Sequence, residues 1–329
     1  MSLSHDIADY PEGIVLAVDK PYRWTSADVI RKLKYAAIRH FRKKNLKVGH
    51  AGTLDPLATG VLLVCIGPAC RRAQELQDHD KEYIATVRFG ATTPSYDLEK
   101  EVDRTFPYAH ITETAVREAL KGFVGEQEQV APLFSAKSVD GVRSYELARK
   151  LYRSGRFSEI DATALETLHR SRIVISEIEL LGFTPAADAL PACPTPVASA
   201  SPTPPIAGDG PLPLMGPEVG PPKSHGFLGY PRVATGPDRS LPSGQVSAAS
   251  SRIHVADTSD LGLCEARIRI VCSKGTYIRA FARDLGEALG SGAHLGGLIR
   301  SRSGDYTLKG ALSVEDALAL FQVDVVMAL

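Results

Sequence analysis

The spacing of apolar residues along the chain predicts several strands. Residues 81–90 (KEYIATVRFG) and 264–272 (CEARIRIVC) alternate apolar and polar side chains. A period of two puts every second side chain on one face of a strand. In the first segment one face carries Tyr83 and Phe89. Residues 172–183 (RIVISEIELLGF) are rich in Ile and Val and also favour a strand.

Helical periodicity occurs between these strands. Residues 26–40 repeat apolar positions every three to four residues, and Ser26 can cap the first turn. The apolar face of this helix comprises Val29, Ile30, Leu33 and Ala37. Shorter helices are expected over residues 112–121, ended by Gly122, and over residues 279–290. Strands in hairpins, with interspersed helices and no regular βαβ repeat, indicate an α+β fold: a mainly antiparallel central sheet flanked by helices.

A proline-rich segment separates the last two predicted strands. Residues 185–242 hold 15 of the 22 prolines and are rich in Ala, Ser and Gly. Proline lacks a backbone N–H donor, and a segment without periodic apolar residues cannot form a core. Because the flanking strands look like one hairpin, we interpret residues 185–250 as a disordered loop inserted into a single domain, residues 1–184 and 251–329. A linker between two domains is the alternative.

Overall composition and net charge indicate no particular function, but the charge of one segment does. The 329 residues are 44% hydrophobic and 23% charged, with zero formal net charge, as in ordinary globular proteins. Between Lys20 and Lys47, however, the chain has ten basic residues and one acidic residue, Asp28. Such a block can bind the phosphates of a nucleic acid. A solvated surface is the simpler alternative.

Several classes of protein lack support in the sequence. The cysteines form no C-x-x-C pair and no metal-ligand spacing with the histidines, so we expect reduced thiols and no metal. They are Cys65, Cys70, Cys193, Cys264 and Cys272. The N-terminus has no signal-peptide core and no apolar run has membrane-spanning length, which indicates a cytoplasmic protein. The sequence has no phosphate-binding loop, dinucleotide-binding or nucleophile-elbow motif. If the protein is an enzyme, we expect it to work with its side chains alone, without a cofactor.

The segment GHAGTLDPLATG (residues 49–60) places one carboxylate, Asp55, among small turn-forming residues. Asp can accept a backbone N–H, and Pro56 suits the first helical position. Gly60 follows too soon for a real helix, and the apolar run VLLVCIG comes next. The residues alone fit a capped turn that leads into a buried strand and a functional carboxylate equally well.

Four separated segments together resemble the TruB-type pseudouridine synthases, which modify the T-loop uridine of tRNA. They are residues 18–30 (VDKPYRWTSADVI), 49–71 (GHAGTLDPLATGVLLVCIGPACR), 78–90 (DHDKEYIATVRFG) and 272–286 (CSKGTYIRAFARDLG). Their order and approximate spacing are those of the family, and residues 131–149 and 290–304 resemble it as well. The resemblance covers nearly everything outside the proline-rich segment and the last residues. It implies an α+β catalytic domain and a cofactor-independent tRNA pseudouridine(55) synthase.

The resemblance also implies three catalytic residues. Asp55 would be the nucleophile that attacks the sugar or the base ring and holds the fragments covalently. Arg279 would pair with this carboxylate and favour its ionised form. Tyr83 would stack on the target base, near the C5 proton that must leave.

Five further residues would bind the substrate. His50 matches the residue that helps to fill the space of the flipped-out uridine. Tyr277 and Leu298 match positions that line the pocket. Lys20 and Arg71 match basic positions near the RNA and the site, the latter a lysine in some relatives. The expected partner is the T arm of tRNA, with no membrane contact and no obligate protein partner.

The sequence departs from the family's pattern in three places. Only 27 residues follow Arg302, so we expect no C-terminal RNA-binding domain, and the basic block would matter more. Ile299 stands where relatives often have a second arginine, and Lys137 falls one position early. Two alternatives stay open: a synthase with other RNA targets, and a non-catalytic RNA-binding protein or tRNA folding chaperone.

Overall fold

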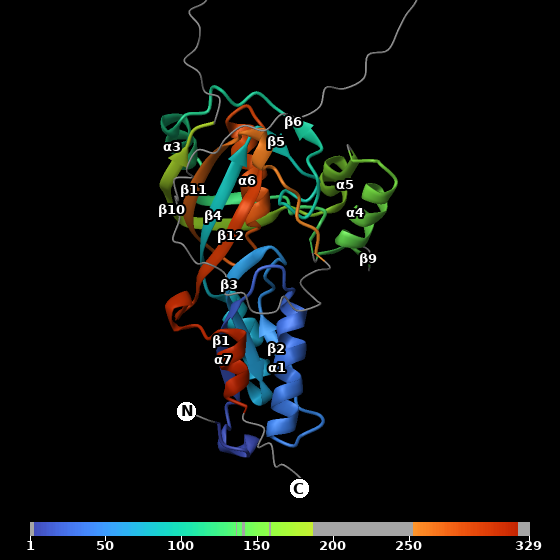
Figure 1. Ribbon diagram of the computed structural model, residues 1–329, viewed down its shortest axis with the longest axis vertical. Helices are drawn as coiled ribbons and strands as arrows, with labels where there is room; N and C mark the ends of the chain where they lie inside the picture. The colour runs from blue at the N-terminus through green and yellow to red at the C-terminus, as the bar shows by residue number, and fades with distance from the viewer. Residues whose placement is uncertain (1–2, 136, 140–141, 158, 187–252, 322–329) are drawn as a thin grey trace, which may run out of the picture. The chain divides into compact units, whose positions relative to one another are not determined.

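A computed structural model describes residues 3–135, 137–139, 142–157, 159–186 and 253–321 (Figure 1). The strands are β1 (Ile14–Lys20), β2 (Val48–Ala51), β3 (Ala58–Ile66), β4 (Lys81–Phe89), β5 (Ala91–Thr92), β6 (Arg104–Thr105), β7 (Gly125–Gln129), β8 (Ser138–Val139), β9 (Val142–Arg143), β10 (Ser171–Thr184), β11 (Cys264–Cys272), β12 (Ala293–Ser303) and β13 (Tyr306–Thr307). The helices are α1 (Ser26–His40), α2 (Ala73–Asp78), α3 (Glu113–Lys121), α4 (Ser144–Arg153), α5 (Glu159–Thr167), α6 (Ile278–Ala288) and α7 (Val314–Ala319).

One large sheet connects most of these strands in the order β1-β3-β12-β4-β11-β10-β7, with β2 paired to β3 and β13 to β12. Its neighbouring strands are antiparallel except β3 and β12, which are parallel. Helices lie beside the sheet (Figure 1). The predicted α+β class is therefore confirmed.

The hairpin predicted across the proline-rich segment is also confirmed. β10 and β11 pair antiparallel from Ile175 opposite Cys272 to Thr184 opposite Glu265. Described strands on both sides of the segment thus belong to one sheet. Residues 187–252, which hold nearly all of the predicted insertion, lie outside the described residues.

β3 is buried on both faces, which explains the unbroken apolar run after the Asp55 turn. The even-numbered residues from Leu62 to Ile66 pack against α1 and α7. The odd-numbered residues from Val61 to Cys65 face α2 and the short 3₁₀ helix η2 (Gly67–Arg72). A strand with only one buried face would instead alternate apolar and polar residues. The turn before β3 is therefore attached to a strand that is covered on both sides.

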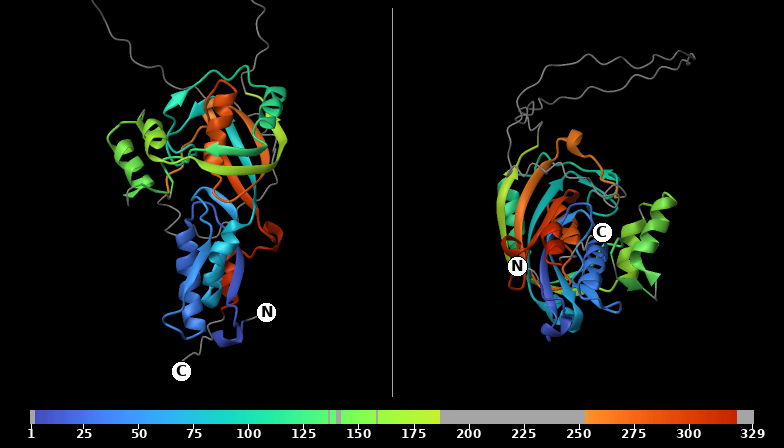
Figure 2. Two further views of the ribbon diagram at one scale, coloured as in Figure 1. Left: turned by 180° about the vertical axis from the view of Figure 1, so that it is seen from behind. Right: turned by 60° about the horizontal axis from the view of Figure 1, so that its bottom comes forward.

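Another core lies where α3 and α6 cover one face of β4, β10, β11 and β12 (Figure 2). Ala85, Val87 and Phe89 of β4 are buried in it, and Tyr83 packs at its border. These residues share the face that the alternation predicts. The apolar side of β4 therefore ends at a tyrosine that only partly enters the core.

The predicted helices are present, with one correction at a cap. α1 spans the predicted residues, but its N-cap is Thr25 rather than Ser26. Thr25 and Asp28 form a reciprocal capping box, which leaves the Ser26 hydroxyl to another contact. α3 has Thr112 and Gly122 as its caps, as expected. α6 begins and ends within two residues of its predicted bounds.

Helices α4 and α5 pack on each other beside the sheet (Figure 1). We call residues 130–135, 144–157 and 159–168 the α4–α5 lobe. The lobe has a small core of its own, which comprises Val130, Ala131, Leu133, Phe134, Ala148, Leu151, Ile160, Ala164 and Leu168.

Candidate active site around Asp55

Asp55 lies in the turn between β2 and β3. The Ala58 N–H donates to the Asp55 carbonyl at 3.1 Å, which closes the turn directly before β3. The buried Ser26 hydroxyl of α1 accepts from the Leu54 N–H at 2.9 Å and donates to the Leu54 carbonyl at 3.1 Å. The interpretation as a turn leading into a buried strand is confirmed, and α1 fixes the residue before Asp55.

Lys20, at the end of β1, holds the same turn from inside the protein. Its Nζ donates to the carbonyls of Pro21, Trp24 and Pro56 at 3.0, 2.6 and 3.2 Å. Burial lowers the pKa of Lys20 to about 7, although the nearby Asp55 carboxylate acts in the opposite direction. The side chain is 0% exposed. Lys20 thus lies beside the site, bound to backbone carbonyls of the turn, and a contact between Lys20 and RNA stays a prediction.

Arg300 of β12 holds the turn from another side. Its Nε donates to the Val61 carbonyl at 2.7 Å, and its Nη atoms donate to the Thr53 and Gly52 carbonyls at 3.4 and 3.2 Å. Gly60 lies opposite Arg300 in the parallel pair, with a φ of 102°. A Cβ there would lie 2.3 Å from the Arg300 carbonyl oxygen, so glycine permits this close approach of β3 and β12.

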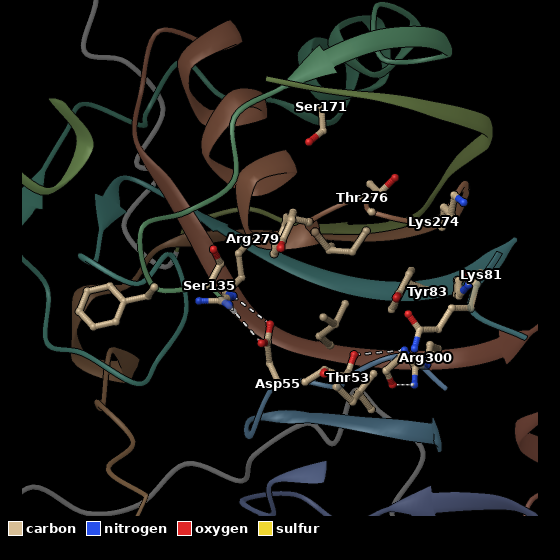
Figure 3. Close-up of a pocket in the computed structure, with 18 of the residues that line it drawn as sticks. Thr53, Asp55, Lys81, Tyr83, Ser135, Ser171, Lys274, Thr276, Arg279 and Arg300 are labelled. Atoms are coloured by element: carbon tan, nitrogen blue, oxygen red, sulfur yellow. Dashed lines mark hydrogen bonds and ion pairs between the residues drawn. The ribbon is translucent and has the colours of Figure 1, made fainter. Parts of the chain in front are cut away.

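The Asp55 carboxylate forms a two-point ion pair with Arg279 in the first turn of α6 (Figure 3). The Nε–Oδ2 and Nη2–Oδ1 distances are 2.9 and 3.0 Å. Arg279 Nη1 also donates to the Ser95 carbonyl at 3.1 Å. The Arg279 side chain is 6% exposed, whereas that of Asp55 is 35% exposed. A buried cation thus orients a carboxylate that solvent can reach.

A second carboxylate, Asp97, lies behind this pair. Its Oδ2 is 3.7 Å from Arg279 Nε, and its Oδ1 accepts from Ser95 Oγ at 2.6 Å and the Glu99 N–H at 2.9 Å. Burial raises the pKa of Asp97 to about 6, against the influence of Arg279. Burial lowers the pKa of Arg279, but Asp55 and Asp97 outweigh this effect and raise it. The guanidinium therefore stays charged and fixed.

A cavity of about 740 Å³ opens over the Asp55–Arg279 pair (Figure 3). The turn, β4, β12, the loop before α6 and the α4–α5 lobe all contribute to its wall. Its basic residues are Lys81, Arg149, Arg172, Lys274, Arg279 and Arg300, and its acidic residues are Asp55 and Glu99. The volume is typical of ligand sites, roughly 300–1,000 Å³. The excess of cations suits a polyanion.

Three more residues predicted to bind or react line this cavity: Tyr83, Tyr277 and Leu298. Burial raises the pKa of Tyr83 and that of Tyr277, so both phenols are neutral at pH 7. The Gln129 amide accepts from the Tyr277 N–H at 2.9 Å and donates to its carbonyl at 3.2 Å. The fold thus brings these three residues to the same cavity as Asp55 and Arg279.

His50 and Arg71 do not line the cavity. His50 lies half-buried on β2, and burial lowers its pKa, so the ring is neutral at pH 7. Its Nδ1 is buried without a hydrogen-bond partner among the described residues. Arg71 is exposed in η2. RNA contacts of these two residues stay predictions.

The sequence analysis missed Asp97, Lys81 and Arg300. Burial lowers the pKa of Lys81 to about 8, and its Nζ donates to the Gln77 and His79 carbonyls. The signal for Lys81 was a charge on the otherwise apolar face of β4. Asp97 lies outside any periodic segment and gave no such signal.

Comparisons with known proteins agree on one family. The model of "TruB family pseudouridylate synthase (N terminal domain)" matches residues 39–183. "tRNA pseudouridine synthase B" of Phocaeicola vulgatus is 42% identical over 307 residues, which cover 93% of this chain and 92% of that protein. The proteins of the same name from Flavobacterium johnsoniae and Deinococcus radiodurans are each 35% identical. They cover 93% and 92% of this chain, and the match spans 95% and 77% of their own lengths.

Among solved structures, a chain of "a Cbf5-Nop10-Gar1 Complex" matches with a TM-score of 0.49 and 20% identity. The match covers 95% of this chain and 56% of that longer chain. Within the described residues, no group of three or more His, Cys, Asp or Glu side chains could hold a metal ion. No helix of the described part is long and apolar enough to cross a membrane.

Proposed function

The chain belongs to the TruB family of pseudouridylate synthases and is an isomerase, a tRNA pseudouridine synthase, and we propose that Asp55 is the nucleophile of its reaction. The proposed target is the T-loop uridine of tRNA, and the proposed place of action is the cytoplasm. The observation that carries the Asp55 assignment is its two-point ion pair with the buried Arg279, at the base of a basic cavity.

The reaction breaks the bond between uracil N1 and ribose C1′, turns the base and joins C5 to C1′. C5 then loses its proton and N1 gains one, so nothing is added or removed overall. The Asp55 carboxylate bonds temporarily to the sugar or to the ring and keeps the fragments in the site. Its 35% exposure leaves the carboxylate open to the cavity. The proposal holds for either point of attack.

Arg279 has two tasks in this proposal. It points the carboxylate into the cavity through two parallel hydrogen bonds, a geometry that arginine provides and lysine does not. It also places a positive charge beside the carboxylate when the bound RNA excludes water. The Ser95 carbonyl and Asp97 fix the guanidinium in turn.

Tyr83 is proposed to stack on the target base and to relay the C5 proton. Its ring lies at the border of a hydrophobic core and lines the cavity. Because burial raises the pKa of Tyr83, the hydroxyl stays protonated at pH 7. It can therefore accept the C5 proton as it releases its own proton to water in the cavity.

The RNA backbone is proposed to follow two basic surfaces. One is the cavity wall, where the exposed cations are Arg149, Arg172 and Lys274. The other is the exposed face of α1 and the residues after it. Eight of the ten basic residues between Lys20 and Lys47 are exposed: Arg31, Lys32, Lys34, Arg39, Arg42, Lys43, Lys44 and Lys47. The uridine must leave its stack before it can reach Asp55, and His50 is proposed to contact the space that it vacates.

Release of tritium tests this function. Unmodified tRNA labelled at uridine C5 is incubated with the purified protein, because the label leaves only when C5 bonds to carbon. We expect one tritium per tRNA, without added cofactor or protein. Tight tRNA binding without release would favour the RNA-binding or chaperone alternative. Release from another RNA in place of tRNA would favour other targets.

A further inference from the structure

The segment Ile253–Thr258, which we call the strap, contacts both loops that position the Asp55–Arg279 pair. The Ala256 N–H donates to the Leu98 carbonyl at 2.7 Å, and Leu98 follows Asp97 directly. At the other end, the Ile253 carbonyl accepts from Arg23 Nη2 at 2.6 Å. The strap therefore joins the Asp97 loop to the turn that contains Arg23.

Arg23 in turn contacts the Asp55 turn through its backbone. Its N–H donates at 3.0 Å to the carbonyl of Pro56, the residue after Asp55. The same carbonyl accepts from Lys20 Nζ at 3.2 Å. Arg23 therefore holds the carbonyl of the residue that follows the proposed nucleophile.

The conformation of Arg23 is unfavourable in two respects. Its φ is 63°, in the left-handed region that a residue with a Cβ rarely adopts. Its Nε is buried without a hydrogen-bond partner among the described residues. Backbone strain of this kind persists where surrounding contacts require it, often at functional sites. Among the described residues, the hydrogen bond that holds this side chain is the one to the Ile253 carbonyl of the strap.

The strap has other attachments that keep it in place. Thr258 is buried, and its Oγ1 accepts from Arg88 Nη1 at 2.8 Å. Ala256 is 3% exposed. His254 Nε2 lies 2.6 Å from Glu101 Oε1 in an exposed hydrogen bond. Arg23 therefore bonds to a segment that other contacts hold in place, so this bond can fix the position of Arg23 relative to the Asp97 loop.

We propose that Arg23 is a positioning residue for the reaction, which couples the Asp55 turn to the Asp97 loop through the strap. The inference rests on the proposed function of Asp55. Arg23 does not line the cavity, and its guanidinium is bound to Ile253, so it acts on the substrate only through Asp55. Small misplacements of a reacting group, near 1 Å, can slow a reaction by about a hundredfold.

The Arg23→Gly variant isolates this role. Glycine accepts a φ of 63° without strain, so the turn stays intact and only the bond to the strap is lost. Arg23→Lys keeps a donor that can reach the Ile253 carbonyl. Arg117→Ala, which removes an exposed arginine of α3, is the matched control.

Single-turnover tritium release at saturating tRNA, tRNA affinity by filter binding, and amide hydrogen exchange are measured for all variants. We expect Arg23→Gly to slow turnover by about tenfold, because a loss of this size corresponds to roughly one charged hydrogen bond. The affinity for tRNA should stay within twofold. Arg23→Lys should recover part of the rate, and Arg117→Ala should behave as the unchanged protein. Exchange should speed up at both Ala256 and Ala58 in Arg23→Gly.

Three results would overturn the positioning role: normal turnover of Arg23→Gly, an equal loss of rate and affinity, or no recovery in Arg23→Lys. If the unchanged protein released no tritium, the proposed function would fail instead. Hydrogen exchange still tests the coupling in that case, because faster exchange at Ala256 without any change at Ala58 would disprove it.

Discussion

The Asp55 turn and the α4–α5 lobe line the same cavity but are supported in opposite ways. The turn is bonded to buried side chains from β1, α1 and β12, and it leads into a strand covered on both faces. The lobe packs around a core of its own. The proposed nucleophile is thus held by bonds from distant strands and a helix, whereas the lobe on the cavity wall packs around a separate core.

The surface chemistry of the two regions differs as well. Lys20 and Arg300 are fully buried beneath the turn and bind carbonyl groups. On the lobe, Arg149 lines the cavity, and Arg149 and Arg153 border a second hollow of about 480 Å³. Buried cations position the chemistry, and exposed cations can bind phosphates.

Asp55→Asn should have the largest effect. The amide is nearly isosteric but a poor nucleophile, so turnover should fall at least about a thousandfold. Binding of tRNA should stay within a few-fold, because the cations of the wall remain. Tritium release and filter binding measure both quantities. Activity within tenfold of the unchanged protein would remove Asp55 from the role of nucleophile.

Tyr83 lies on β4 and lines the cavity, and two variants separate the effect of its ring from that of its hydroxyl. Tyr83→Phe keeps stacking and should lose about a hundredfold in turnover, typical of lost proton transfer. Tyr83→Leu should be slower still and bind more weakly, because base–aromatic stacking contributes roughly 1–3 kcal/mol. Similar, near-normal rates of both variants would exclude Tyr83 from the active site.

The buried Lys20, which supports the turn, should make the free energy of unfolding depend on pH. Its pKa is about 7 in the folded protein, below the ordinary 10.5, because burial disfavours the charge. Between these values the unfolded chain binds more protons, so the free energy of unfolding rises with pH. Between pH 7 and pH 9, the free energy of unfolding measured in urea should rise by about 2 kcal/mol more for the unchanged protein than for Lys20→Met. Parallel pH curves would show that the folded state leaves this pKa unshifted.

The lobe should give the smallest effect. Arg149→Ala combined with Arg153→Ala should weaken tRNA binding about fivefold and flatten the salt dependence by roughly 1–2 units of log–log slope. Single-turnover rates at saturating tRNA should not change. Replacement of Glu113 and Glu118 on α3 by Gln is a control away from the cavity. A slower saturated rate in the lobe variant would mean that the lobe also positions the chemistry.

The sequence predicted the parts of this arrangement that depend on local periodicity. The α+β class, β4, α1, α3 and the β10–β11 hairpin follow from apolar spacing and caps. The resemblance selected Asp55, Tyr83 and Arg279, which the fold brings to one cavity. It placed Lys20 near the RNA and the site, but the burial of Lys20 could not be predicted, because a lysine after an apolar strand gives no sign of burial.

The supports of the site could not be predicted, since they depend on distant segments. Arg300 reaches the Gly52 carbonyl from β12, and Asp97 approaches Arg279 from a loop without periodicity. Arg23 reads as one more member of a basic block, and only its φ and its bond to Ile253 distinguish it. A charged residue that binds distant backbone carbonyls cannot be recognised from the spacing of residues in the sequence.

A map of pseudouridine at nucleotide resolution tests the central claim most directly. Unmodified tRNA is treated with the protein or with Asp55→Asn under identical conditions. The account predicts one new pseudouridine, in the T loop, that is absent after treatment with the variant. The same pseudouridine formed by Asp55→Asn would contradict the claim that the fixed Asp55 carboxylate performs the reaction.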